Sequence, residues 1–203
     1  MKIPDISMYN LPIPCVILAR KNSKGLKNKN IKLLNGITLI EHSILYAKKS
    51  KLVSHIIVST DDKKIHKIAI KHKCISVFPR PKKLSSDNSR SEPAIKHALE
   101  NFIKKFGKID IYAYLQVTEP FRPKNILDKC LQNLIMKNSI ESSFAGFIQH
   151  KNFWVKKNNS FVKLNQQKID HLPRQKRASI YREDTGIALA SRYKLIRKGF
   201  RIG

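Results

Sequence analysis

The stretch "VILARKNSKGLKNKN", residues 16–30, decides how the rest of the chain is interpreted. An apolar run ends abruptly, and five basic residues and a glycine follow it. The full run at residues 13–19 is typical of a strand that is buried on both faces. The basic loop after it could bind a nucleic-acid backbone, cradle the phosphates of one nucleotide, or be an ordinary solvated loop.

Strands and helices alternate along most of the chain. The expected strands are 13–19, 55–60, 74–78, 111–117 and 140–147, and the expected helices are 38–50, 61–73, 91–106 and 123–137. This alternation predicts an α/β fold with a mostly parallel sheet and helices on both of its faces. Ligands of such sheets bind at the carboxyl ends of strands, where the basic loop lies.

Short polar residues mark the expected starts of two helices. Ser91 is the expected N-cap of the helix over 91–106, which has a proline in its first turn. Asp61 and Asp62 are expected to cap the helix over 61–73.

The pattern changes after residue 148 and divides the chain into three parts. Residues 1–148 are the expected nucleotide-binding α/β core, 149–180 a very basic arm, and 181–203 a return to the core. Within the arm, "FWV" and "SFVKL" predict a β-hairpin with "KKNN" as its turn.

The chain is strongly basic, with 41 Lys and Arg against 14 Asp and Glu and a formal net charge of +27. Such a field attracts polyanions. The bias extends over the whole chain, however, and Lys, Ile and Asn dominate its composition, as in a compositionally skewed genome. No basic stretch alternates with regularly spaced aromatic residues as a stacking platform would, so nucleic acid is not the expected partner.

The cysteines and the N-terminus indicate the compartment. Three scattered cysteines without a C-x-x-C pair favour buried thiols in a reducing compartment, so a cytoplasmic protein is expected. The apolar run "LPIPCVILA" is nine residues long and lacks a cleavage site, which predicts neither a signal peptide nor a membrane anchor.

The first loop has the residue types of a phosphate site. Such a site needs backbone N–H groups, a glycine for close approach, and cations that reach several oxygens. The loop is neither G-x-x-x-x-G-K-[ST] nor G-x-G-x-x-G, so it is not one of the common nucleotide loops. By pattern alone, a phosphate cradle and a solvated loop both remain open.

Five ordered motifs make the interpretation more specific. They are "ILARKNSKGLKNKNIKLLNGITLIEHSI", "IIVSTDD", "RPKKLSSDNSRSE", "LQVTEPFR" and "YREDTGIALA", and together they span nearly the whole chain. In this order they resemble the acylneuraminate cytidylyltransferase family, which includes the CMP-sialic acid, CMP-nonulosonate and CMP-Kdo synthetases. The resemblance implies a Rossmann-like, three-layer nucleotidyltransferase fold with a small β-rich dimerisation arm.

The resemblance also implies a reaction. These enzymes join CTP to an acidic 2-keto sugar, giving a CMP-sugar for surface glycan biosynthesis and pyrophosphate, normally with Mg²⁺. Catalysis in such a transfer is mostly positioning and neutralisation of charge on the triphosphate. The implied partners are therefore CTP, an acidic 2-keto sugar and a second copy of the chain.

Site residues follow from the matched motifs. Arg20 and Lys29 are the implied catalytic residues, which would hold phosphate oxygens. The implied nucleotide-binding residues are Ala19, Arg20, Asn22, Ser23, Lys24, Gly25, Lys29, Asn30, Arg80, Ser89 and Ser91. Lys21 and Lys27 are not part of the family pattern and are expected to be background charge.

The sugar site is implied by the later motifs. The residues that match are Gln116, Arg174, Gln175 and Asp184. In the family, the arm brings basic residues into the site of the neighbouring subunit; a solvated basic run is the alternative for this segment. Glu119, Asp184 and Ala188 depart from the common pattern, so the sequence does not specify which sugar acid is used. Arg122 is expected to order the loop.

The largest departure from the family pattern concerns the ligands of the metal ion. Family members continue into a D-x-D-x-x-x-D segment that supplies the Mg²⁺ ligands, whereas this sequence ends at "KGFRIG". No acidic residues in the sequence replace this motif at a suitable spacing. The expectation is a truncated or impaired chain that binds CTP and turns it over poorly.

Two other functions remain open at this point. One is another sugar nucleotidyltransferase of the same fold, although the G-x-G-x-R-x-x-P-x-x-K signature typical of those enzymes is absent. The other is a non-catalytic nucleic-acid-binding protein, which would bind DNA or RNA with a steep salt dependence and would not bind CTP.

Overall fold

A computed structural model describes residues 9–21, 25–86, 89–164 and 172–203. The chain forms two compact units. Unit 1 comprises Met1–Ala145 and Thr185–Gly203, and unit 2 comprises Gly146–Asp184.

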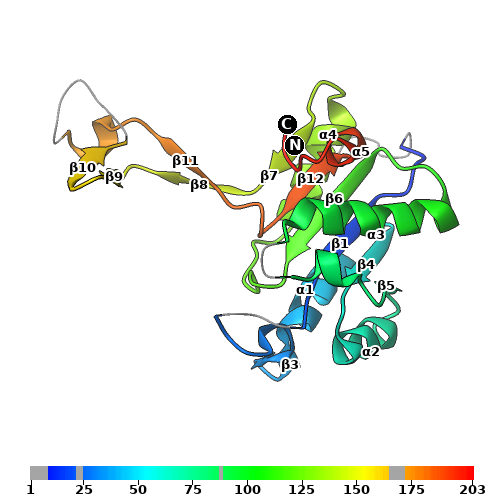
Figure 1. The fold of residues 1–203 in the computed structure, drawn as a ribbon. Helices are drawn as coiled ribbons and strands as arrows, with labels where there is room; N and C mark the ends of the chain where they lie inside the picture. The colour runs from blue at the N-terminus through cyan, green and yellow to red at the C-terminus, as the bar shows by residue number, and fades with distance from the viewer. Residues whose placement is uncertain (1–8, 22–24, 87–88, 165–171) are drawn as a thin grey trace. The chain divides into compact units, whose positions relative to one another are not determined.

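Unit 1 is built on a six-stranded sheet with the order β5-β4-β1-β6-β12-β7 (Figure 1). Its strands are β1 (Pro14–Leu18), β4 (His55–Ser59), β5 (Ile75–Val77), β6 (Ile111–Gln116), β7 (Ser142–Phe144) and β12 (Leu189–Arg192). The first four strands of the order pair in parallel, and β12 is antiparallel to both of its neighbours.

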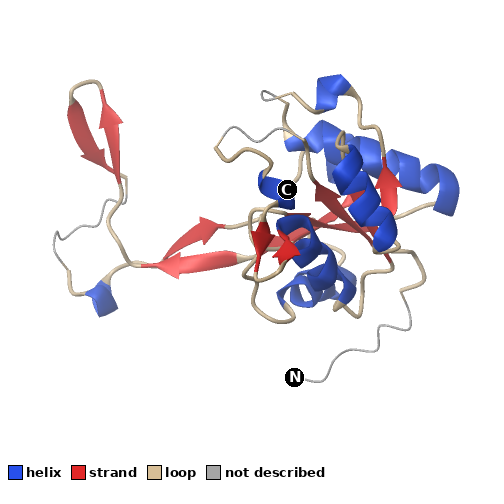
Figure 2. Cartoon of the chain, turned by 90° about the horizontal axis from the view of Figure 1, so that it is seen from below, coloured by secondary structure: helices blue, strands red, loops and turns tan. Residues whose placement is uncertain are grey.

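Helices cover both faces of this sheet (Figure 2). The helices of unit 1 are α1 (Leu39–Lys48), α2 (Lys63–Lys71), α3 (Ser91–Phe106), α4 (Ile126–Met136) and α5 (Tyr193–Arg197), with short 3₁₀ turns η2 (Lys29–Ile31) and η3 (Lys82–Leu84). A small hairpin, β2 (Leu33–Leu34) and β3 (Ile37–Thr38), precedes α1.

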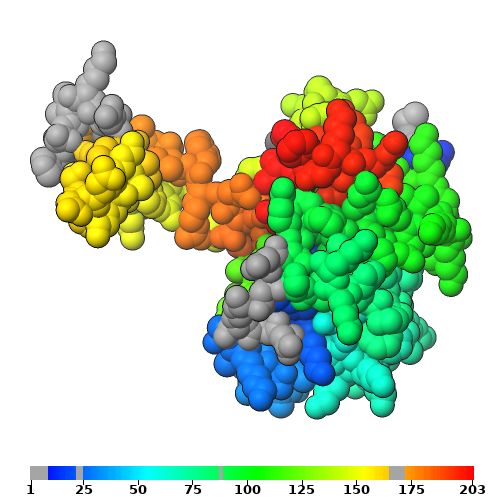
Figure 3. All heavy atoms as spheres, in the orientation of Figure 1, coloured from blue at the N-terminus to red at the C-terminus, as the bar shows by residue number. Residues whose placement is uncertain are grey.

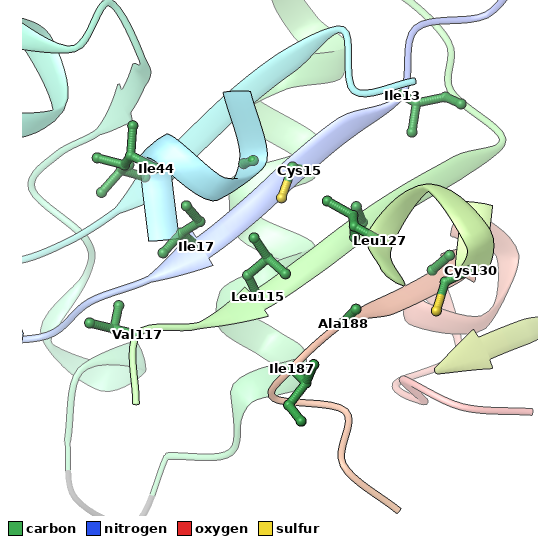
Figure 4. Close-up of a cluster of buried hydrophobic side chains, with 14 of the residues drawn as sticks. Ile13, Cys15, Ile17, Ile44, Leu115, Val117, Leu127, Cys130, Ile187 and Ala188 are labelled. Carbon is green, nitrogen blue, oxygen red and sulfur yellow. The ribbon is translucent and has the colours of Figure 1, made fainter. Parts of the chain in front are cut away.

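The alternation of side chains along the central strands divides the core into two layers. On β1, Cys15 and Ile17 belong to a cluster that includes residues of α1 and α4, and Figure 4 shows part of it. Val16 belongs to a second cluster, which includes residues of α3 and α5. Figure 3 shows α5 (red) packed beside α3 (green) on that side. The sheet therefore lies between two apolar layers, and the predicted mostly parallel α/β fold is confirmed.

One predicted strand is wrong. Residues 140–147 do not form a single strand, because the chain leaves the sheet of unit 1 after β7. The Ala145 N–H donates to the carbonyl oxygen of Ala188 at 2.9 Å, and β8 (Gly146–Gln149) then pairs within unit 2. The helix before this strand also differs from prediction: α4 begins at Ile126, after Asn125 in a left-handed conformation, rather than at residue 123.

The predicted helix caps are correct only in part. Asp62 is the N-cap of α2, and its carboxylate accepts a hydrogen bond from the Lys64 N–H at 2.7 Å. The carboxylate of Asp61 instead accepts from the Lys21 N–H at 2.8 Å. Ser91 is the first residue of α3 and not its cap, because the N-cap position is Arg90.

Unit 2 consists of two antiparallel ribbons, drawn in red in Figure 2. β8 pairs with β11 (Ile180–Glu183), and β9 (Trp154–Lys157) pairs with β10 (Ser160–Lys163). The second ribbon confirms the predicted hairpin, whose turn contains Asn158 at φ 53°. A 3₁₀ turn, η4 (Arg174–Lys176), precedes β11. Large apolar side chains of unit 2 are exposed, and they include Phe147, Trp154, Phe161 and Tyr181.

No helix among residues 9–21, 25–86, 89–164 and 172–203 combines the length and the apolar character needed to cross a membrane.

Candidate functional site

A pocket of about 450 Å³ lies where β1 and β6 end and α3 begins. Its walls come from the loops after β1 and β6, from the segment before α3, and from the first turn of α3. The lining residues are Leu18, Arg20, Gly25, Lys29, Asn30, Arg80, Leu84, Ser86, Ser89, Arg90, Ser91, Ala94, Tyr114, Gln116, Val117 and Thr118. Because β1 and β6 are parallel, their carboxyl ends meet at this edge of the sheet.

Most of the expected nucleotide-binding residues line this one pocket. They are Arg20, Gly25, Lys29, Asn30, Arg80, Ser89 and Ser91, and the expected sugar-binding residue Gln116 lies with them. Ala19 is fully buried behind the lining, and its N–H donates to the carbonyl oxygen of Ser59 at 3.1 Å. Asn22, Ser23 and Lys24 lie outside the described residues.

A buried asparagine joins the two ends of the first loop. Asn30 is 7% exposed, and its Nδ2 donates to the carbonyl oxygen of Arg20 at 2.8 Å. Lys29 opens the short turn η2 directly after Asn28, whose left-handed backbone (φ 56°) reverses the chain. The loop therefore begins and ends at the pocket, which brings Arg20 and Lys29 to the same wall.

A second arginine lies deeper in the same wall. Arg80 is 4% exposed, and its Nε donates to Ser85 Oγ at 3.0 Å. Burial lowers the pKa of its guanidinium, the nearby Asp61 opposes that shift, and Arg20 adds to it. Asp61 Oδ1 lies 4.0 Å from Arg80 Nη2, and Asp61 and Arg20 are both close enough to Arg80 to shift its pKa. Arginine stays protonated in proteins, so this wall carries excess positive charge that suits an anionic ligand.

Hydroxyl groups line the pocket between η3 and α3. Ser86 Oγ and Ser89 Oγ are 2.6 Å apart, and Ser89 Oγ donates to the carbonyl oxygen of Lys83 at 2.7 Å. Side chains that both donate and accept can read the polar edge of a nucleobase or a ribose.

The opposite wall is provided by β6. Tyr114 and Gln116 are two residues apart, so they lie on the same face of the strand. Thr118 Oγ1 donates to Gln116 Oε1 at 3.4 Å. Burial raises the pKa of Tyr114, while the nearby side chains of Arg201 and Gln116 oppose that shift, so its hydroxyl stays protonated and can act as a donor. Two hydroxyl groups, of Tyr114 and Thr118, thus lie near the carboxamide of Gln116.

Arg122 connects the loops after β6 and before β12. Its Nε donates to the carbonyl oxygen of Ile187 at 2.9 Å, and its Nη1 donates to Ser43 Oγ at 3.3 Å. Its Nη2 donates to the carbonyl oxygen of Gln116. Burial lowers the pKa of Arg122 to about 10. These contacts fix the backbone on which Gln116 is mounted, as expected for a residue that orders the loop.

Several lining residues were not predicted from the sequence. They include Arg90, Tyr114 and Thr118. Tyr114 could have been found, because it shares a strand face with Gln116. Arg90 and Thr118 lie within the matched motifs "RPKKLSSDNSRSE" and "LQVTEPFR". The motifs alone do not indicate that these two side chains face the pocket, because that depends on how two loops fold back over the sheet.

The described residues do not supply the ligands of a magnesium ion. The lining of the pocket contains no carboxylate, although Mg²⁺ prefers carboxylate oxygens together with water and phosphate oxygens. Within residues 9–21, 25–86, 89–164 and 172–203, no three or more His, Cys, Asp or Glu side chains gather in a metal-binding arrangement. The donor set described here does not fit the cation.

The remaining expected sugar-binding residues belong to unit 2. Arg174 lines a pocket of about 300 Å³ in that unit together with Arg177, and Gln175 lies within η4. Arg177 donates from Nε to the carbonyl oxygen of Leu172 at 2.6 Å. The carboxylate of Asp184 is paired with Arg182 Nη2 at 2.9 Å. Unit 2 thus has a basic pocket of its own, and Asp184 already has a cationic partner.

One family model matches the part of the chain that contains the sheet, the pocket and the sequence motifs. A family model described as cytidylyltransferase matches residues 14–198, which is nearly the whole chain. The chain belongs to the cytidylyltransferase family. Because residues 14–198 contain all five motifs recognised in the sequence, the match confirms the resemblance from which the site was predicted.

Curated relatives of this cytidylyltransferase family member include proteins of Campylobacter. The chain is 46% identical over 111 residues to post-translational flagellin modification protein B of Campylobacter coli, covering 54% of this chain and 47% of that protein. It is 34% identical over 125 residues to pseudaminic acid cytidylyltransferase of Campylobacter jejuni (strain 81-176), covering 62% of this chain and 54% of that protein. The chain thus spans about half the length of the curated relatives it matches.

Two solved structures have a similar fold. A CMP:2-keto-3-deoxy-manno-octonic acid synthetase complexed with CTP has a TM-score of 0.67 at 18% identity, over 93% of this chain and 77% of that one. A 4-diphosphocytidyl-2C-methyl-D-erythritol synthase of Anaerococcus prevotii has a TM-score of 0.60 at 13% identity, over 93% and 75%. At these identities the likeness shows the fold.

Proposed function

We propose that this chain carries the core of an enzyme that transfers CMP from CTP to a nonulosonic 2-keto sugar acid, for surface glycan biosynthesis. One observation carries the proposal: Arg20, Lys29, Arg80 and Gln116 line a single pocket in a member of the cytidylyltransferase family. Relatives named as pseudaminic acid and N,N'-diacetyllegionaminic acid enzymes support the class of sugar acid.

The first loop binds the triphosphate in this proposal. Arg20 and Lys29 contact phosphate oxygens and neutralise the charge that develops as pyrophosphate leaves. Gly25 borders open space, since a Cβ built on it meets no atom within 4 Å, and its backbone N–H can approach a phosphate closely there. The loop residues Asn22, Ser23 and Lys24 add further donors.

The wall formed by Arg80, Ser89 and Ser91 binds the nucleoside. Cytosine is distinguished from uracil at its 4-amino edge, where a site built of hydrogen-bonding groups rejects a base that presents the wrong partner. The hydroxyl of Ser89 and neighbouring backbone carbonyls provide acceptors for that amino group. Arg80 is then held against the ribose or the phosphates by its bond to Ser85.

The sugar acid lies toward Gln116, whose carboxamide donates to and accepts from its hydroxyl and acyl groups. Its anomeric hydroxyl attacks the α-phosphorus and loses its proton to water, so that a new P–O bond forms to the sugar oxygen while the P–O bond to pyrophosphate breaks. The chain's own contribution is to orient the two substrates and to neutralise charge. Mg²⁺ is the expected cofactor, and its protein ligands are not among the described residues of the pocket.

Unit 2 serves as a dimerisation arm in the proposal. Arg174 and Gln175 reach the sugar carboxylate of a second copy, with Asp184 at the base of the arm. Support comes from the exposed aromatic side chains of unit 2, which suit an interface, and from its basic pocket. The three free cysteines are all buried, in keeping with a reducing, cytoplasmic setting.

A nucleotide screen tests the proposal. CTP, UTP, ATP and GTP are titrated into the chain, and binding is followed by calorimetry and by thermal unfolding. CTP alone should bind and raise the unfolding temperature, and Arg20→Ala and Lys29→Ala should each weaken CTP binding about tenfold or more. Lys71→Ala, at the exposed end of α2, is the matched control for lost charge.

Pyrophosphate release with CTP and a panel of sugar acids tests the second substrate. The panel contains pseudaminic, N,N'-diacetyllegionaminic, N-acylneuraminic and 2-keto-3-deoxy-manno-octonic acids. Equal binding of all four nucleotides, or nucleic-acid binding without CTP binding, contradicts the proposed function.

A further inference from the structure

A buried glycine lies directly against the side chain of Gln116. A Cβ built on Gly186 would stand 3.1 Å from Gln116 Oε1, 3.2 Å from Gln116 Cδ and 3.1 Å from Glu119 Cγ. These distances are shorter than ordinary van der Waals contacts of a methyl group. The backbone of Gly186 does not have a positive φ, so glycine is required here for space rather than for conformation.

The backbone around this contact is fixed from several sides. The Gln116 N–H donates to the carbonyl oxygen of Gly186 at 3.0 Å. Arg122 donates to the carbonyl oxygens of both Gln116 and Ile187, which joins the two backbone segments through one buried side chain. The segment over 185–190 is itself buried. A methyl group at position 186 would therefore displace a side chain rather than separate the two segments.

The side chain that gives way is that of Gln116. It lines the pocket, whereas Gly186 is not among the lining residues, so a displaced carboxamide moves away from Gly186 and into the space of the pocket. Its bond from Thr118 Oγ1, at 3.4 Å, is already long and is easily lost.

We infer that Gly186 is a specificity-determining position, because its missing side chain sets where the carboxamide of Gln116 stands and thus which sugar acids fit. The inference rests on the proposed function, in which Gln116 contacts the sugar. Gly186 acts through Gln116 and is a positioning residue. The nucleotide side of the pocket, formed by Arg20, Lys29 and Arg80, is not part of this contact.

The inference is tested by measuring how the substitution Gly186→Ala in the full chain changes the binding of sugar acids. The variant and the unmodified chain are saturated with the α,β-methylene analogue of CTP, which prevents turnover, and are then titrated with the four sugar acids of the panel. The affinity for the acid that the unmodified chain prefers should fall about tenfold, or the order of preference should change. The affinity for CTP should stay within about twofold.

Two double variants identify which side chain is displaced by the methyl group at position 186. Gln116→Asn shortens the side chain by one methylene, so adding Gly186→Ala to Gln116→Asn should cause little further loss of acid affinity. Glu119→Ala removes the other close neighbour of Gly186. The double variant Glu119→Ala with Gly186→Ala should bind the sugar acid as weakly as Gly186→Ala alone. If the Glu119 double variant instead regained the sugar-acid affinity of the unmodified chain, the inference would be overturned.

The remaining outcomes separate the inference from the proposed function. If the unmodified chain binds CTP but none of the acids, the proposed function fails and the inference falls with it. If the unmodified chain and Gly186→Ala bind the acids equally, the inference alone is wrong. If Gly186→Ala does not fold, a folded Gln116→Asn double variant supports the contact, and an unfolded one refutes it.

Discussion

At the scale of single residues, Arg80 shows how burial and charge combine in the pocket. Its guanidinium is almost completely buried, bonded to Ser85 and close to Asp61, so its position is fixed before any ligand arrives. A fixed donor loses little freedom when a ligand binds. Lysine at this position would keep the charge and lose the planar group that bonds Ser85.

Arg80→Lys is therefore predicted to weaken CTP binding about tenfold, with only a small change in overall charge distribution. The measurement is calorimetric titration of CTP, together with thermal unfolding to show that the variant is folded. Arg197→Lys, at an exposed position of α5, is the matched control and should bind CTP normally. Equal weakening in both variants would mean that Arg80 contributes charge alone.

Much of this residue-level detail was not accessible from the sequence. The motif "RPKKL" placed Arg80 among the nucleotide-binding residues, but nothing in it indicates burial or the contact with Asp61. The same limit applies to Gly186, whose importance depends on the side chain of a residue seventy positions away. Contacts between distant loops follow from the packing of the sheet, which periodicity does not encode.

At the scale of elements, the start of α1 is held by a network that extends to α2. Thr38 and Glu41 form a capping box, in which the Thr38 N–H donates to Glu41 Oε2 at 2.9 Å. Glu41 Oε1 also pairs with His72 Nε2, at the C-cap of α2, at 3.0 Å. The bond with His72 is the largest cause that lowers the pKa of Glu41 to about 2, with Thr38 adding to it and burial opposing it.

Glu41→Gln is predicted to remove a pH-dependent part of the stability. The folded state favours the ionised carboxylate, so its contribution is fully present above the ordinary pKa of 4.5 and is lost as the pH falls toward about 2. Urea unfolding at pH 6 should show the variant about 1 kcal/mol less stable than the unmodified chain. The difference should shrink at pH 3.

The control for this prediction is Glu100→Gln, a carboxylate on α3 outside the network. A difference between Glu41→Gln and the unmodified chain that is the same at pH 6 and pH 3 would show that the contact is not ionic.

The elements themselves were largely predictable, because apolar periodicity is a local property. The strands β1, β4, β5 and β6 and the helices α1, α2 and α3 lie close to their predicted ranges, as do β9 and β10, whereas the hairpin of β2 and β3 was not predicted. The failures have long-range causes that local periodicity does not contain. Ala145 bonds to Ala188 and divides one apolar run into two strands, and "IYRE" pairs with a segment more than thirty residues away.

At the scale of the whole molecule, unit 2 is inserted between two strands that are neighbours in the sheet of unit 1. β7 and β12 are antiparallel, with Phe144 opposite Leu189, and the Ala145 N–H bonds to Ala188. The two ends of the insertion therefore leave unit 1 close together. This arrangement is the one in which a segment can be removed without stretching the remaining chain.

A chain in which a short Gly-Ser linker replaces residues 146–184 is predicted to fold and to bind CTP with unchanged affinity, since the pocket lies within unit 1. Light scattering should give the mass of a monomer, whereas the unmodified chain, at 23.4 kDa per copy, should give twice that mass. Loss of CTP binding in the shortened, folded chain would show that unit 2 contributes to the nucleotide site.

The three buried cysteines give this molecule a practical property. Burial raises the pKa of Cys15 to about 12 and the pKa values of Cys74 and Cys130 to about 11, so thiolate is scarce at neutral pH. Reagents that modify thiolates should leave the native side chains untouched. A fluorophore or spin label could thus be attached at a single introduced cysteine on unit 2 and another on α2, in the natural background. Energy transfer or dipolar spectroscopy would then report the distance between the two labels with and without CTP and sugar acid.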